Sequence, residues 1–248
     1  MDAAIRVAEL RASRGISWLA ESFHVFKRAP LAWIGLSAGW LGITLALFFK
    51  VPFIGEVLAN FLQPVFFASF AIAARKQSNG EKIVMADLFA GFRRNWRALV
   101  NVGAIMLLVQ FLVLLVLAMF GLSLAAPPDR EMTVADVAQM FQGKEWLLVA
   151  AIVLTAIVKG AFWFAPALIA FHDMPTLHAI RWSIYAALAN VGVMVTYVAA
   201  LTLLFLVGMI PWLVGLLVVI PMMVISTFVG YREVFEAAAP AAADPESA

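Results

Sequence analysis

The stretch from Trp146 to Asp173, WLLVAAIVLTAIVKGAFWFAPALIAFHD, determines the fold class of this chain. A helix needs about 20 consecutive apolar residues to cross a bilayer, and this run is longer. It contains a single lysine, Lys159, near its middle, and Pro166 follows a few residues later. We therefore expect residues 146–171 to form a transmembrane helix that carries one cation at mid-depth.

The composition extends this prediction to the whole chain. Of its 248 residues, 65% are hydrophobic and 13% are charged, and the mean hydropathy is +0.98. Soluble domains contain roughly 45–50% apolar and about 25% charged residues, so the composition predicts an all-α polytopic membrane protein. The net charge of +2 is too small to indicate a nucleic-acid partner, and the absence of cysteine excludes disulfides and thiolate chemistry.

Six apolar runs of spanning length follow one another, and we expect residues 16–236 to form one membrane domain. The first run is longer than the apolar region of a signal peptide and lacks a small-residue cleavage site, so we expect it to remain as an anchor. Residues 1–15 are predicted to be a cytoplasmic segment, and residues 237–248, AAAPAAADPESA, a disordered tail. The predicted spans are about 30–49, 57–74, 99–120, 146–171, 191–209 and 211–230.

Short amphipathic segments precede three of the spans. Residues 16–28, 86–97 and 172–190 place apolar side chains at spacings near three and four, and the first two carry clustered basic residues. This pattern is typical of helices that lie in the headgroup plane. The longest polar connection, residues 121–145, contains a further short helical candidate at 134–141.

The distribution of basic residues predicts the orientation. Because six spans place both termini on one side, each lysine and arginine can be assigned to a side. Lys50, Arg130 and Lys144 fall on the side away from the termini, and Lys159 lies within a span. The others fall on the side of the termini: Arg6, Arg11, Arg14, Lys27, Arg28, Arg75, Lys76, Lys82, Arg93, Arg94, Arg97, Arg181 and Arg232. The positive-inside rule therefore predicts that both termini are cytoplasmic.

The sequence also divides into three similar units, and each unit consists of an amphipathic segment followed by a predicted helix hairpin. The units begin near Ile16, Ala86 and Leu177. SFHVFKRAP at 22–30 resembles SIYAALAN at 183–190, and the turn VPFIG at 51–55 resembles IPWLVG at 210–215. A parallel repeat and chance similarity between apolar hairpins both explain this pattern.

The segments FWFAPAL and HD at 162–173, together with ESFHVFKRAPLAW at 21–33, LFAGFRRNW at 88–96 and VGYREVF at 229–235, carry a resemblance. The chain resembles a family of bacterial inner-membrane proteins described only as hypothetical transmembrane proteins. It is more distantly similar to the membrane domain of some glycerophosphodiester phosphodiesterases. The resemblance implies topology and an inner-membrane location, and it implies no activity or residue roles.

Lys159 is the first candidate for a binding site. A lysine at the centre of a span is costly, by roughly 2.5–3.5 kcal/mol on insertion scales, so it should face protein or water. Gln110 is the polar group expected at the same depth, and Gln63 and Trp163 are further candidate lining residues. The amine is either neutral and hydrogen-bonded or charged in a wet cavity that attracts an anion. A lysine with only a structural role is the alternative.

Two other clusters have simpler interpretations. Arg93, Arg94 and Arg97, together with Lys27 and Arg28, form basic patches that suit contact with anionic lipid headgroups. His172, Asp173, His178 and His24 lack the spacing of a metal motif, so we expect no metal ligation and no cofactor.

No catalytic signature accompanies these residues, and we expect no enzyme activity. Two functional classes remain open. One is a small transporter-like or channel-like protein for a small solute or lipid. The alternative is a non-transporting protein that organises anionic lipid or partner proteins. The oligomeric state cannot be predicted from the sequence.

Overall fold

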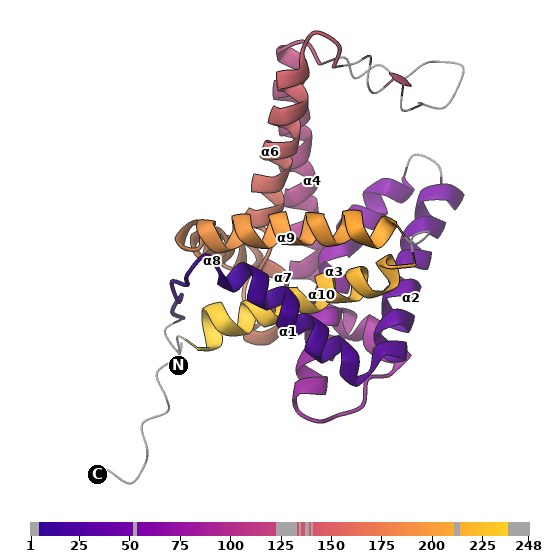
Figure 1. Cartoon of the computed structure of the whole chain (residues 1–248), viewed down its shortest axis with the longest axis vertical. Coiled ribbons are helices and arrows are strands. Elements are labelled where there is room, and N and C mark those ends of the chain that lie inside the picture. Colours follow the sequence, from indigo (N-terminus) through magenta and orange to yellow (C-terminus); the bar gives the residue numbers. More distant parts are fainter. Residues whose placement is uncertain are drawn as a thin grey trace.

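A computed structural model describes residues 5–51, 54–122, 133, 135–136, 139, 141–210 and 214–237. Among these residues all regular structure is helical, as predicted (Figure 1). The elements in chain order are α1 (Arg14–Arg28), α2 (Pro30–Lys50), α3 (Gly55–Ser78), the 3-10 helix η1 (Met85–Arg93), α4 (Trp96–Met119), α6 (Glu145–Ala161), α7 (Ala165–His172), α8 (Thr176–Ala189), α9 (Val191–Met209), α10 (Leu216–Tyr231) and the π-helical turn η2 (Arg232–Glu236).

Six stretches of helix are long and apolar enough to cross a membrane, which confirms the predicted fold class. They are Pro30–Lys50, Gly55–Ser78, Trp96–Met119, Glu145–His172, Val191–Met209 and Leu216–Glu236. The last span begins later than predicted, at Leu216, and extends further. Half of the helical candidate at 134–141, and the tail from residue 238 onward, lie outside the described residues.

The fourth span differs from the continuous helix that we predicted. Helix α6 ends at Ala161 and α7 begins at Ala165. Pro166 has no N–H, and its ring would conflict with the carbonyl of Phe162 in an uninterrupted helix. The N–H of Phe164 instead donates to Oγ of Ser183 in α8 at 3.0 Å, in a buried position. Lys159 therefore lies in the last turn of α6 rather than at the middle of a helix.

The helices form three hairpins, α2–α3, α4–α6 and α9–α10, each preceded by one of the predicted amphipathic segments. These segments are α1, η1 and α8. Helices α1 and η1 begin within two residues of their predicted starts, and α8 begins four residues after its predicted start, at Thr176. Each packs mainly on the hairpin of another unit: α1 on α9 and α10, η1 on α2 and α3, and α8 on α6 and α7. The order is cyclic, because every segment covers the preceding hairpin and the first covers the last.

The apolar faces of these amphipathic segments pack on protein. Trp18 of α1 is fully buried, and its Nε1 donates to Glu233 at 2.6 Å. A Cβ on Gly15 would lie 2.3 Å from the carbonyl oxygen of Val193, so α1 touches the backbone of α9 directly. Residues 86–97 likewise do not form one α-helix, since η1 ends at Arg93 and α4 begins at Trp96.

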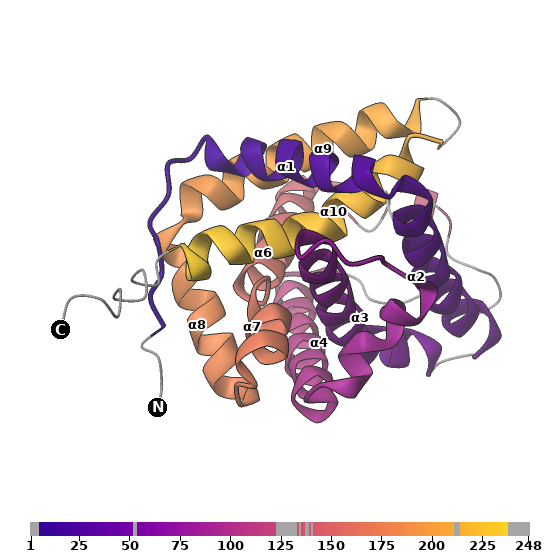
Figure 2. The same cartoon turned by 90° about the horizontal axis from the view of Figure 1, so that it is seen from below.

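The core lies where the second arms of the hairpins meet. Helices α3, α7 and α10 contact one another, and each contains a buried proline: Pro64, Pro166 and Pro221. In both Figure 1 and Figure 2, α1, α9 and α10 run crosswise to α4 and α6. The α4–α6 hairpin projects from the body, and large apolar side chains such as Phe111 and Ile152 are exposed on it, as suits contact with lipid.

Candidate functional site

The structure places the predicted midplane residues on separate elements and joins none of them to another by a hydrogen bond. Lys159 is exposed on α6, and Nε2 of Gln110 donates to Oγ1 of Thr155 at 3.1 Å, so the partner of Gln110 is a threonine. The ring of Trp163 packs on Tyr197, with centroids 5.2 Å apart, and its buried Nε1 has no partner among the described residues. Gln63 is half-buried on α3.

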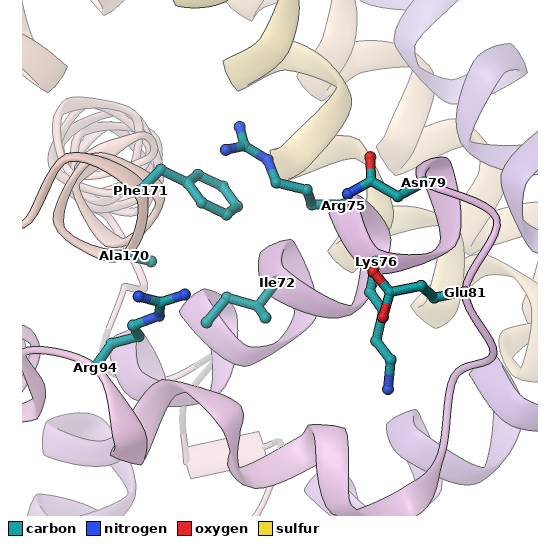
Figure 3. A pocket seen from close by; sticks show the side chains of 8 residues that line it. All are labelled: Ile72, Arg75, Lys76, Asn79, Glu81, Arg94, Ala170 and Phe171. Atoms are coloured by element: carbon teal, nitrogen blue, oxygen red, sulfur yellow. The ribbon is translucent and has the colours of Figure 1, made fainter.

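A basic cleft lies instead where the last turns of α3 and α7 meet the connection from η1 to α4 (Figure 3). It consists of two adjoining cavities of about 340 and 460 Å³, within the usual range for ligand pockets. Arg94, Ala170 and Phe171 line both. The first is also lined by Ile72, Arg75, Lys76, Asn79 and Glu81, and the second by Arg93, Asn95 and Asp173.

Arg75 is held in this cleft by aromatic rings and a carboxylate. Its Cζ lies 3.6 Å from the ring centroid of Phe171, and the rings of Phe228 and Tyr231 are within 5.8 Å. Its Nη2 also pairs with Glu236 of η2. In the sequence Arg75 appears only as a cation that ends the second span. The sequence does not indicate these contacts of Arg75, because the partners come from helices that are distant along the chain.

The predicted lipid-contact residues Arg93 and Arg94 line the cleft, and neither has an ion-pair partner within the part of the chain described. In Figure 3 the guanidinium of Arg94 points toward Ala170, while Lys76 points away from the arginines. Nζ of Lys76 binds both carboxylate oxygens of Asp87 at 3.1 Å. Arg93 and Arg94 are therefore the cations of the cleft that have no carboxylate partner among the described residues and are available to bind an anion.

The other predicted lipid contacts are exposed outside the two cavities. Arg97 lies over the exposed ring of Trp96 at 5.7 Å, and Lys27 lies over Phe23 at 5.0 Å. Arg28 ends α1 and is exposed. Cations beside exposed aromatic rings suit the headgroup region of a bilayer.

The end of α1 and the end of α3 lie together. Nε2 of Gln77 donates to the carbonyl of Val25 at 3.2 Å, and its Oε1 accepts from Nε1 of Trp33 at 2.9 Å. We call the surface that carries the cleft, Arg97, Lys27 and Arg28 the basic face. It is the face that the sequence predicts to be cytoplasmic.

In the structure, His172 links two helices through a hydrogen bond, and Asp173 ends a helix. Nε2 of His172 hydrogen-bonds to the hydroxyl of Tyr231 at 2.7 Å, which joins α7 to α10. Asp173 ends α7 in the left-handed conformation, with φ of 50°. Over the described ranges, no three His, Asp or Glu side chains are grouped so that they could hold a metal ion.

A second polar network fastens the N-terminal part of the chain to the C-terminal hairpin. Arg14 donates to Glu233, and this hydrogen bond raises the pKa of Arg14 above its ordinary value. The buried side chain of Asn190 accepts from the N–H of Leu10 at 2.9 Å and donates to the carbonyl of Ala8 at 2.9 Å. Residues 8–14 therefore lie against the junction of α8 and α9 and against η2.

Six apolar helices of spanning length, together with the basic face, are the features of a multi-pass membrane protein. The chain is 28% identical over 207 residues to a protein of Burkholderia thailandensis named as a probable inner membrane protein, and the match covers 78% of this chain and 74% of the relative. This relative and the six helices together support a location in a bacterial inner membrane. No protein-family model matches the chain, and no solved structure matches it. The distant similarity to phosphodiesterase membrane domains stays a prediction.

Proposed function

We propose that this protein binds anionic lipids at its predicted cytoplasmic face and organises them around its helices, without moving a solute across the membrane. The observation that carries the proposal is the position of its cavities. The two cavities described above open beside Arg75, Arg93 and Arg94, at one end of the helices. Lys159 and Gln110 line neither of them.

Elementary electrostatics supports lipid as the partner. Basic residues near a negatively charged leaflet each contribute about 1 kcal/mol of attraction, and this attraction falls off within a Debye length. On the basic face, Arg97 and Lys27 stand beside exposed aromatic rings, so each cation is paired with a group that favours the interface. Exposed apolar side chains on α4, α6 and α9 supply the surface that acyl chains would cover.

A spin-label experiment in nanodiscs tests this proposal. Spin-labelled phosphatidylglycerol and phosphatidylcholine report how much of each lipid is immobilised at the protein surface. We expect phosphatidylglycerol to be enriched, the enrichment to fall as salt is added, and Arg93→Gln/Arg94→Gln/Arg97→Gln to reduce it. The matched control is Lys50→Gln/Lys144→Gln, which removes exposed cations from the opposite predicted side and should leave the enrichment unchanged. Equal immobilisation of both lipids by the unmodified protein would refute the proposal.

The transporter-like alternative stays a prediction with a distinct requirement. It needs a water-filled path at mid-depth with Lys159 on its wall, and Lys159→Leu must then abolish uptake of the solute. Our proposal expects that variant to bind anionic lipid as the unmodified protein does.

A further inference from the structure

We propose that the arginine end of the basic cleft is a binding site for one phosphate group, supplied by the headgroup of an anionic phospholipid or by a free phosphate. This inference rests on the proposed function and deepens it, because it replaces general attraction at a surface with one saturable site. The two cations that define the site are Arg75 and Arg94, which line the same cavity of about 340 Å³.

Arg75 is oriented before any ligand arrives. Its Cζ lies over the ring of Phe171 at 3.6 Å from the centroid, and the rings of Phe228 and Tyr231 lie further out, at 5.7 and 5.8 Å. A guanidinium is planar, and its fork of N–H groups matches the oxygens of a phosphate. Little side-chain freedom then remains to be lost when an anion binds.

Arg94 approaches from the opposite side of the cavity. Figure 3 shows its guanidinium beside Ala170, and the ring of the next residue, Phe171, extends toward Arg75. It comes from the short connection between η1 and α4, and no described carboxylate pairs with it. An anion in this cavity would therefore meet one arginine that is fixed and one whose donors are free.

The rest of the lining favours a lipid as the source of the phosphate. Ile72, Ala170 and Phe171 place apolar groups directly beside the two arginines. A phospholipid has the matching order, with a phosphate joined to an apolar stem. Inorganic phosphate has no group to place on this apolar wall, so we expect it to bind more weakly than a short-chain phospholipid.

Glu236 is an internal competitor for the same site. Its carboxylate pairs with Arg75 from η2, and 37% of its side chain is exposed, so it can move away without uncovering a buried core. A phosphate that binds Arg75 must share or displace this carboxylate. Removing the charge of Glu236 should therefore tighten phosphate binding, whereas removing the charge of either arginine should weaken it.

The experiment uses the full chain in an uncharged detergent and follows binding by isothermal titration. One arm titrates dioctanoyl phosphatidylglycerol, and the other titrates inorganic phosphate. We expect one lipid per chain, a loss of affinity of about tenfold or more for Arg94→Gln and Arg75→Gln, and a gain for Glu236→Gln. The control is Lys50→Gln, which removes an exposed charge that lies in neither cavity and on the opposite predicted side, and the affinity of this variant should stay within about twofold of that of the unmodified protein.

Comparison of the two titrations also identifies the source of the phosphate group. Saturation by the lipid with weak or no binding of inorganic phosphate indicates a lipid headgroup, and equal affinity for both indicates a free phosphate. No saturable binding in either titration, or equal losses of affinity for Arg94→Gln and Lys50→Gln, would overturn the site. Because Arg94 lies on an exposed connection, its variant tests the site even if Arg75→Gln does not fold. Loss of this site with phosphatidylglycerol still enriched in nanodiscs would leave the proposed function standing.

Discussion

The guanidinium of Arg75, in the last turn of α3, lies 3.6 Å from the ring centroid of Phe171, in the last turn of α7. This contact joins the first hairpin to the second. Beside it, His172 of α7 hydrogen-bonds to Tyr231 of α10, which joins the second hairpin to the third. The ends of all three inner helices therefore meet at one polar cluster, and the basic cleft opens next to it.

The break in the fourth span should depend on one hydroxyl. Ser183 is fully buried, and its Oγ accepts from the N–H of Phe164, a backbone donor left free by the end of α6. We expect Ser183→Ala to lower the unfolding free energy by about 1–3 kcal/mol, because an unsatisfied buried donor remains. The matched control is Ser78→Ala, since the exposed Ser78 bonds only to Ala74 of its own helix. Thermal melts in detergent measure both, and equal melting temperatures for the two variants would contradict this account.

The cyclic packing of the units should depend on close backbone contact. A Cβ on Gly91 of η1 would lie 2.2 Å from the carbonyl oxygen of Val65 in α3. We expect Gly91→Ala to destabilise the protein by about 1–3 kcal/mol, because η1 must move away from α3. Gly42 of α2 has open space around its Cβ position, so Gly42→Ala should be neutral or stabilising. Thermal melts in detergent measure both variants. Equal melting temperatures for Gly91→Ala and Gly42→Ala would show that η1 does not pack on α3 as described.

The orientation can be tested with single cysteines because the chain has none of its own. Glu81 and Gln142 are exposed and lie in connections predicted to be on opposite sides of the membrane. In intact cells we expect an impermeant maleimide to label Gln142→Cys, and to label Glu81→Cys only after the membrane is opened. Labelling of both variants in intact cells, or of Glu81→Cys alone, would reverse the predicted topology.

Much of the fold is predictable because it depends on local sequence. Apolar runs give the six spans, and the spacing of apolar residues gives the starts of α1 and η1 to within two residues and that of α8 to within four. The prolines alone do not predict where a helix breaks. Pro64 stays inside α3, whereas Pro166 follows a break, and the difference depends on Ser183 of a later helix, which offers an acceptor to the freed N–H.

The site was only half predictable for a similar reason. Arg93 and Arg94 stand out in the sequence as adjacent basic residues, and they do line the cleft. Arg75 does not stand out, because its importance comes from Phe171 and Glu236, which are distant in sequence. We expected Lys159 at the middle of one continuous helix with Gln110 at the same depth, but α6 ends at Ala161, and Gln110 bonds to Thr155.

Lys159 provides a test between the two functional classes. It is exposed on α6 and has no ion-pair or hydrogen-bond partner among the described residues. A charge on an apolar helix surface is unfavourable in lipid, so Lys159→Leu should leave stability unchanged or raise it. Lysine-to-leucine exchange should also leave the enrichment of phosphatidylglycerol unchanged. A folded variant that loses this enrichment would show that Lys159 belongs to the lipid-binding surface.

The central claim is that this protein selects anionic lipid through its basic face. The most direct measurement is the native mass spectrum of the full chain, purified from its membrane in a mild non-ionic detergent. We predict adducts with the masses of anionic phospholipids, and we predict that Arg93→Gln/Arg94→Gln/Arg97→Gln retains fewer of them than Lys50→Gln/Lys144→Gln. Adducts of zwitterionic lipid alone, or of a small solute that disappears in Lys159→Leu, would contradict the claim.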